Sequence, residues 1–153
     1  MSRGNARADI FWSDDDRRRF LAQLQDGVRT AGVVLYAYVL MDNHFHLLLR
    51  TPRANLSRFM QRLSTSYALY CRYKHRRPGH QLEGRFKAKL VEEETYLLAL
   101  TRYIHLNPVK TAACRRMPKA ARLRRLERYA WSSYPGYVAA KRAAEFVCYD
   151  LIC

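Results

Sequence analysis

The sequence predicts an α+β fold for a single domain, and three observations lead to this prediction. Two apolar runs with a polar break at Asp42-Asn43 occupy 33–50, which is the pattern of a β-hairpin or of two consecutive strands. Before and after this pair, apolar residues recur at three- and four-residue steps, which indicates amphipathic helices. The chain has 153 residues, 49% of them hydrophobic, so it is long enough for one core and too short for two comfortable domains.

Three helices are predicted around the strand pair. The first covers about 14–30, because Ser13 can cap a helix whose first turn holds three consecutive aspartates. The second spans about 55–74, and the third runs from about 92 to 107, where Pro108 favours a helix end. These helices and the strand pair supply the apolar faces of one core.

The remaining segments have weaker patterns. Alternation over 84–91 predicts a further strand with a basic face. Residues 109–128 are strongly basic and can form either a short helix or a loop. Residues 131–134, Trp-Ser-Ser-Tyr, are expected to return the chain to the core.

Charge is the outlying property of the composition. Twenty-eight Lys and Arg against 13 Asp and Glu give a net charge of +15 and a pI near 10.2. Such an excess indicates a polyanionic partner, with nucleic acid as the first candidate and a membrane surface as the second. No segment approaches the roughly 20 apolar residues of a spanning helix, so we expect no membrane insertion. A basic RNA-processing or ribosome-associated protein remains an alternative that rests on charge alone.

Cysteine spacing and missing motifs narrow the function further. The cysteines at 71, 114, 148 and 153 contain no CxxC pair, so a disulfide framework or a zinc–thiolate site is not expected and a reducing cytoplasm fits. There is also no GxxxxGK[ST] phosphate loop, no GxGxxG and no acidic cluster of the two-metal nuclease kind.

His44 and His46 form the first candidate site. In a strand alternate side chains share a face, so both imidazoles point the same way, roughly 6.5–7 Å apart along the chain. Two histidines so placed can bind one divalent metal if a third ligand arrives from elsewhere. The alternative is that they merely fill a half-buried face of the sheet.

Tyr103 and Asn107 form the second candidate group. Four residues apart, they share one face of the third predicted helix, and Asn107 Oδ1 could complete a metal site with His44 and His46. A phenol, with a pKa of about 10, is a weak nucleophile until a metal or a base activates it. Attack on a phosphodiester would give a covalent phosphotyrosine and a free hydroxyl. The alternative is a core tyrosine.

Five motifs in order resemble those of the REP-associated tyrosine transposases, which are bacterial relatives of the HUH single-strand transposases of the insertion-sequence-200 type. The resemblance covers about residues 3–151. The motifs are Tyr-Val-Leu-Met-Asp-Asn-His-Phe-His-Leu-Leu-Leu (38–49), Asn-Leu-Ser-Arg-Phe-Met-Gln (55–61), Gly-His-Gln-Leu-Glu-Gly-Arg-Phe-Lys-Ala (79–88), Arg-Tyr-Ile-His-Leu-Asn-Pro-Val-Lys (102–110) and Trp-Ser-Ser-Tyr (131–134).

The resemblance implies a ferredoxin-like sandwich, with an antiparallel sheet and helices packed on one face. It implies one HUH domain over 1–153, with a basic appendage at about 111–153. It also implies the chemistry: His44 and His46 would bind Mg²⁺ or Mn²⁺ with Asn107 as the third ligand, and Tyr103 would be the nucleophile. The enzyme would be a monomer or a homodimer at the bacterial nucleoid. It would cut and rejoin single-stranded DNA near hairpins through a 5′-phosphotyrosine.

The basic residues are the expected DNA contacts. They come from helix two and the loop after it, from the 84–91 segment and from the arginine-rich 115–128 region. The predicted set is Arg62, Arg72, Lys74, Arg76, Arg77, Arg85, Lys87, Lys89, Arg115, Arg116, Arg122, Arg124 and Arg125.

Two departures from the family pattern leave a second function open. Family members usually begin with an extra strand before the turn at 2–5, whereas this chain starts at that turn, so we expect the sheet to lack one strand. The 111–128 connection also lacks the Ala-Gly-Leu-Val pattern expected after Asn-Pro-Val. The alternative function is a catalytically weak or inactive module that grips DNA or RNA hairpins without cutting them.

Overall fold

The computed structural model describes residues 1–76, 82–91 and 94–150, so the predicted DNA contact Arg77 lies outside the described residues. The fold is α+β, as predicted. Within the described residues its antiparallel sheet has three strands in the order β1-β3-β2. The strands are β1 (Ser2–Arg3), β2 (Val34–Met41) and β3 (His44–Arg50). Strands β2 and β3 confirm the predicted hairpin with its break at Asp42-Asn43.

Helices account for most of the remaining described chain. The first two confirm the predicted helices to within one residue at each end, and the third ends before Pro108 as expected. The basic region after residue 109 forms two short helices. The helices are α1 (Asp14–Ala31), α2 (Leu56–His75), α3 (Glu94–His105), α4 (Ala112–Arg115), α5 (Lys119–Arg128) and α6 (Tyr134–Val138), and the 3₁₀ turns are η1 (Asn5–Arg7), η2 (Asn107–Val109) and η3 (Ala140–Arg142).

The chain divides into two compact units, and both include residues of the sheet. Unit 1 comprises Met1–Val34, Asp42–Phe45 and Arg50–Ala88. Unit 2 comprises Leu35–Met41, His46–Leu49 and Lys89–Cys153.

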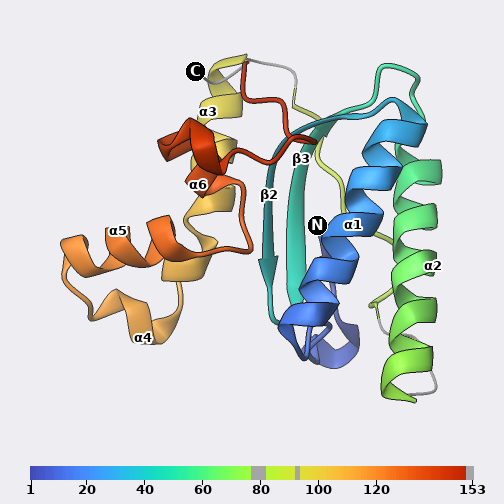
Figure 1. Cartoon of the computed structure of the whole chain (residues 1–153), viewed down its shortest axis with the longest axis horizontal. Helices are drawn as coiled ribbons and strands as arrows, with labels where there is room; N and C mark the ends of the chain where they lie inside the picture. The colour runs from blue at the N-terminus through green and yellow to red at the C-terminus, as the bar shows by residue number, and fades with distance from the viewer. Residues whose placement is uncertain (77–81, 92–93, 151–153) are drawn as a thin grey trace. The chain divides into compact units, whose positions relative to one another are not determined.

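In unit 1, α1 and α2 run side by side (Figure 1). Phe20 of α1 packs against Phe45 of β3 with ring centroids 4.7 Å apart, and against Tyr67 of α2 at 5.2 Å. The buried Tyr67 hydroxyl donates to the Ile10 carbonyl at 2.6 Å, so its one polar atom is satisfied. This aromatic cluster is the core of unit 1.

The ends of α1 follow from its sequence. Ser13 Oγ accepts the Asp16 amide while the Asp16 carboxylate accepts the Ser13 amide, which is a capping box. At the other end Gly32 adopts φ +63°, the left-handed conformation that glycine enters without steric cost.

The N-terminal segment corrects two expectations. Residues 2–5 were predicted as a turn with no strand before it, but Ser2 and Arg3 form β1, paired antiparallel with Phe45 and His44. The predicted strand at 84–91 is wrong: the segment is not a strand, although the Glu83 amide donates to the Arg3 carbonyl and Met1 and Lys87 exchange two hydrogen bonds at 2.9 Å. With only two residues in β1, there is too little backbone beside this segment to form a continuous ladder.

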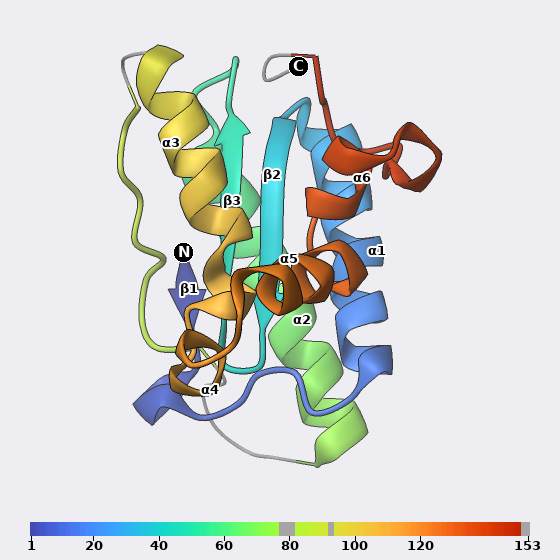
Figure 2. The same cartoon turned by 90° about the vertical axis from the view of Figure 1, so that its left-hand side faces the viewer.

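In unit 2, the segment after α5 lies along β2. The Leu40 amide donates to the Trp131 carbonyl at 2.8 Å, and the Tyr137 hydroxyl donates to the Tyr36 carbonyl at 2.7 Å. Residues 131–134 therefore return the chain to the core, as predicted. Figure 2 shows α4 and α5 following the end of α3, where Val109, Cys114 and Leu126 form a small buried cluster. Across the described residues, no helix combines the length and hydrophobicity required to cross a bilayer.

Candidate metal and nucleophile site

Both candidate histidines lie on β3, one on each side of the buried Phe45. The rings of His44 and His46 are half-buried, so neither is enclosed in the core. Because strand side chains alternate, the two leave the backbone on the same face. Leu48 on that face is buried too, which shows that the strand is covered on both sides.

His44 is held by its neighbour in the hairpin turn. Its Nδ1 lies 2.7 Å from Asn43 Oδ1, and because an amide oxygen accepts hydrogen bonds, this contact fits Nδ1 as the donor. The Asn43 side chain is itself fixed, since its Nδ2 donates to the Arg7 carbonyl at 3.2 Å. A ligating histidine is commonly oriented by such a second hydrogen bond.

Tyr103 does not behave as a core tyrosine. Its side chain, near the C-terminal end of α3, is 49% exposed, although the apolar pattern of the helix favoured burial. The Tyr103 ring contacts the His46 ring edge to face, with centroids 5.9 Å apart and an interplanar angle of 85°. Within unit 2 the candidate nucleophile therefore lies beside one of the two candidate metal ligands.

Asn107 requires a correction to the predicted helix. Helix α3 ends at His105, and Asn107 opens η2 instead of continuing the face that carries Tyr103. Its Nδ2 nevertheless donates to the carbonyls of Tyr103 at 2.9 Å and Ile104 at 3.1 Å, which satisfies two acceptors at the helix end. Because Nδ2 is directed at the helix, Oδ1 points away from those carbonyls and is the atom of this side chain suited to a metal.

Lys110 completes the surroundings of Tyr103. Its Nζ lies 3.5 Å from the centroid of the Tyr103 ring and 3.4 Å from the Tyr103 carbonyl oxygen. This is a cation–π contact combined with a hydrogen bond to a helix-end carbonyl. Desolvation lowers the pKa of the Lys110 ammonium from its ordinary value.

The donor types fit a hard or borderline divalent cation. Two neutral imidazole nitrogens and one amide oxygen are ligands that Mn²⁺ accepts, and Mg²⁺ accepts the oxygen readily. The described parts of the chain hold no group of three His, Cys, Asp or Glu side chains placed to bind a metal.

The predicted DNA contacts differ in how they are held. Arg85, Lys87 and Lys89 are exposed, as are Arg72, Arg76, Arg115, Arg116, Arg124 and Arg125. Lys74 instead pairs with the buried Asp16 at 2.9 Å, Arg62 pairs with Asp26 at 3.4 Å, and Arg122 is half-buried. Lys74 therefore has a structural partner already, whereas the exposed cations remain accessible to phosphate.

Sequence reasoning does not identify Lys110 or Asn43 as site residues. Lys110 lies beyond the end of α3 at His105, so helical spacing from Tyr103 cannot identify it. No local pattern marks Asn43, because its role depends on the Arg7 carbonyl far away in the sequence.

Comparison with known proteins agrees with the resemblance at the family level. Residues 1–107 match the family model described as "Transposase IS200 like". No curated protein and no solved structure matches the chain. The matched region is more than half of the chain and contains His44, His46, Tyr103 and Asn107. The chain therefore belongs to the family of IS200-like transposases.

Proposed function

We propose that this transposase cuts and rejoins single-stranded DNA near hairpins through a covalent 5′-phosphotyrosine on Tyr103. As an IS200-like transposase the chain has DNA as its partner. The observation that carries the proposal is the exposed Tyr103 side chain with the His46 ring 5.9 Å away. A nucleophile that attacks a DNA strand must be accessible to it, and about half of the surface of Tyr103 is exposed.

The reaction exchanges one phosphodiester for another. Tyr103 Oη forms a bond to phosphorus, the bond from phosphorus to the 3′ oxygen of the preceding nucleotide breaks, and that oxygen takes up a proton as the phenol loses one. The phosphotyrosine keeps the bond energy, so attack by a 3′ hydroxyl reverses the step and joins strands without ATP.

His44, His46 and Asn107 would hold Mg²⁺ or Mn²⁺. When bound, the metal would polarise the scissile phosphate. The protein supplies the orientation: Asn43 fixes the His44 ring, and Lys110 lies over the Tyr103 ring. The same proposal places the enzyme in the REP-associated branch, acting as a monomer or homodimer at the nucleoid in a bacterial cytoplasm, since the five motifs resemble that branch.

The test is cleavage of a hairpin-containing single-stranded oligonucleotide with Mn²⁺, followed by denaturing electrophoresis for a protein–DNA adduct. Wild type should form the adduct and Tyr103→Phe should not. Tyr96→Phe is the matched control, because Tyr96 lies on the same helix and is 43% exposed. Cleavage by Tyr103→Phe at the wild-type rate would disprove the mechanism.

The same assay separates the alternative, a hairpin-binding module without nuclease activity. Such a module would bind the hairpin equally well after His44→Ala and would form no adduct in any metal. In contrast, the proposed enzyme should lose the adduct in His44→Ala and in His46→Ala while its binding in EDTA persists.

A further inference from the structure

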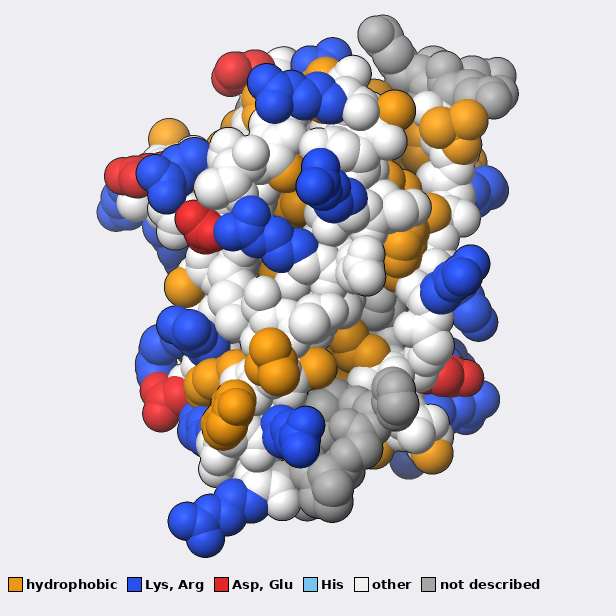
Figure 3. Space-filling model, turned by 90° about the vertical axis from the view of Figure 1, so that its right-hand side faces the viewer, with side chains coloured by type: hydrophobic (Ala, Val, Ile, Leu, Met, Phe, Trp, Pro, Cys, Tyr) orange, Lys and Arg blue, Asp and Glu red, His pale blue; other side chains and the backbone are white. Residues whose placement is uncertain are grey.

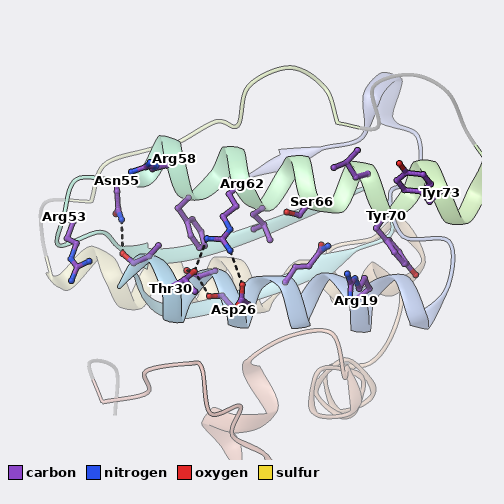
Figure 4. Close-up of a pocket in the computed structure, with 16 residues that line it drawn as sticks. Arg19, Asp26, Thr30, Arg53, Asn55, Arg58, Arg62, Ser66, Tyr70 and Tyr73 are labelled. Atoms are coloured by element: carbon purple, nitrogen blue, oxygen red, sulfur yellow. Dashed lines mark hydrogen bonds and ion pairs between the residues drawn. The ribbon is translucent and has the colours of Figure 1, made fainter.

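A groove between α1 and α2 of unit 1 takes no part in the proposed chemistry. It encloses a pocket of about 970 Å³. The buried Gly27 and Phe59 line it and pack closely, since a Cβ at Gly27 would lie 3.2 Å from Phe59 Cε2. Figure 4 shows side chains of both helices, and Arg53 from the loop before α2, lining the groove along its length.

The lining is strongly basic. Four arginines and only one acidic residue, Asp26, line the groove. The arginines are Arg19, Arg53, Arg58 and Arg62. Asp26 is already shared by Arg29 and Arg62, at 3.2 and 3.4 Å. Figure 3 faces the outer side of these helices and shows Lys and Arg side chains distributed across it, with few acidic ones.

Arg53 and Arg58 lie together at one end of the groove (Figure 4). Both are exposed, and among the described residues neither forms an ion pair with a carboxylate. Arg58 lies in the first turn of α2, which holds no acidic residue, although the helix dipole disfavours a cation there. Helix stability therefore does not explain Arg58, whereas an anionic ligand would.

The other end of the groove is aromatic. Tyr73 is 81% exposed and Leu69 is 47% exposed, and both line the groove beside the half-buried Tyr70. An exposed aromatic face next to arginines suits an unpaired base, which stacks on a ring with little regard to sequence. Fifteen residues of α2 separate Arg58 from Tyr73, which is about 22 Å and room for several nucleotides.

We infer that this groove binds an unpaired stretch of single-stranded DNA, with phosphates at Arg53 and Arg58 and a base stacked on Tyr73. The inference rests on the proposed function only in taking single-stranded DNA as the ligand. Neither Tyr103 nor the metal ligands belong to the groove, so binding here does not require cleavage.

The test is fluorescence anisotropy with a labelled oligothymidylate of about 15 nucleotides, in EDTA and over a range of salt concentrations. Arg53→Gln with Arg58→Gln should weaken binding about 10- to 30-fold at about 0.1 M salt and reduce the log–log salt slope by about 1.4, since each single-strand phosphate contact contributes about 0.7. Tyr73→Ala should weaken binding about 5-fold or more and leave the salt slope unchanged.

The matched control is Arg7→Gln with Lys141→Gln, which removes the same charge from two exposed sites outside the groove. Equal losses in the control and in the groove variant would overturn the inference, because net charge alone would then explain binding. Thermal melts of each variant check folding. If the groove variant unfolds, photocrosslinking of DNA that contains 5-iodouracil to the wild-type protein tests the inference instead. Adducts at Tyr73 would support the inference, and adducts only at other residues would overturn it.

Two competitors separate this occupant from others. A polyglutamate peptide of equal charge should compete poorly, and equal competition would identify a general site for acidic proteins. A duplex of the same length should bind more weakly, and Tyr73→Ala should not change its affinity. Equal affinities for duplex and single strand would contradict the binding of an unpaired base. Full oligothymidylate binding by Tyr103→Phe would support the groove as a binding site even if that variant does not cleave DNA. The binding test is therefore independent of the cleavage test.

Discussion

The Lys110 ammonium lies over the face of the Tyr103 ring, with Nζ 3.5 Å from the ring centroid. The same nitrogen is 3.4 Å from the Tyr103 carbonyl, so one cation contacts both the side chain and the backbone of the proposed nucleophile. Asn107 Nδ2 approaches that carbonyl from 2.9 Å. Tyr103 is therefore fixed from its C-terminal side by residues of the turn that follows α3.

Replacing Lys110 should slow formation of the covalent adduct. Lys110→Met removes the cation–π contact, worth about 0.5–1 kcal/mol at an exposed site, so we expect at least a roughly 2- to 5-fold decrease in the single-turnover rate. Lys110→Arg should keep most of the rate because guanidinium also binds aromatic faces. ¹⁹F NMR of 3-fluorotyrosine at position 103 should shift in Lys110→Met and hardly in Lys110→Arg. An unchanged spectrum and rate in both would exclude a positioning role.

Asn43→Ala should weaken metal binding without removing a proposed ligand. Outer hydrogen bonds of ligating histidines are typically worth about 10- to 100-fold in metal affinity, and we expect a loss in that range for Mn²⁺ by isothermal titration. Asn5→Ala, at an exposed position of η1, the turn that contains Arg7, is the control. Equal Mn²⁺ affinity in wild type and Asn43→Ala would show that the His44–Asn43 contact does not orient a metal ligand.

His105 should make folding sensitive to mild acid. Its buried ring lies 2.8 Å from Ser133 Oγ, and desolvation lowers its pKa to about 4. The unfolded chain, with a histidine pKa near 6.5, takes up the proton first, so this contribution is complete above about pH 6.5 and is lost as the pH falls toward 4. The full effect is about 3 kcal/mol in the free energy of unfolding.

Urea unfolding of wild type and His105→Gln at a series of pH values tests this dependence. Wild type should lose stability steadily between about pH 6.5 and 4, and the variant, which is less stable at neutral pH, should lose much less over the same interval. Parallel pH profiles for the two proteins would assign the acid sensitivity to other groups.

Asp16→Asn should destabilise unit 1 far more than Asp15→Asn. Burial favours a raised pKa for Asp16, but hydrogen bonds from Lys74, His75 and the Trp12 amide outweigh it and hold the pKa well below its usual range. This stability is therefore present above about pH 4 and lost only at lower pH. Asn at position 16 cannot replace these charged contacts, and we expect a cost of about 2–3 kcal/mol.

The exposed Asp15 pairs only with Arg18 among the contacts described and should matter by less than about 1 kcal/mol. Chemical denaturation of the two variants at neutral pH measures the difference. Similar losses in both would mean that Asp16 contributes no more than an ordinary first-turn acid.

Local patterns explain why much of the fold could be predicted. The Ser13 cap and Gly32 mark the ends of α1, and the Asp42-Asn43 break marks the hairpin. The segment at 84–91 has a strand's alternation, but a strand exists only where a partner ladder does, and β1 offers two residues. The length of the neighbouring strand depends on the tertiary structure, so the alternation of side chains within one segment cannot predict it.

The sequence could name the candidate residues of the site, but it could not predict how their side chains are arranged. Spacing could pair His44 with His46 and place Asn107 near Tyr103. It could not show that Tyr103 is exposed, that α3 stops at His105, or that Asn107 binds the helix end through its nitrogen. Those facts depend on side-chain packing and on hydrogen bonds between residues that no periodic pattern relates.

The groove between α1 and α2 is lined by closely packed residues at its base and crossed by an exposed ion pair at its opening. Gly27 and Phe59 pack at its base, and Asn55 Nδ2 ties the start of α2 to the Ala31 carbonyl at 2.9 Å. Arg62, by contrast, spans the opening to Asp26 at 3.4 Å, and both side chains are about half exposed or more. Such a pair is weak in water, so in the inferred complex a phosphate would replace Asp26 at Arg62. In the inferred complex a polyanion would therefore bind and dissociate through the exchange of exposed ion pairs.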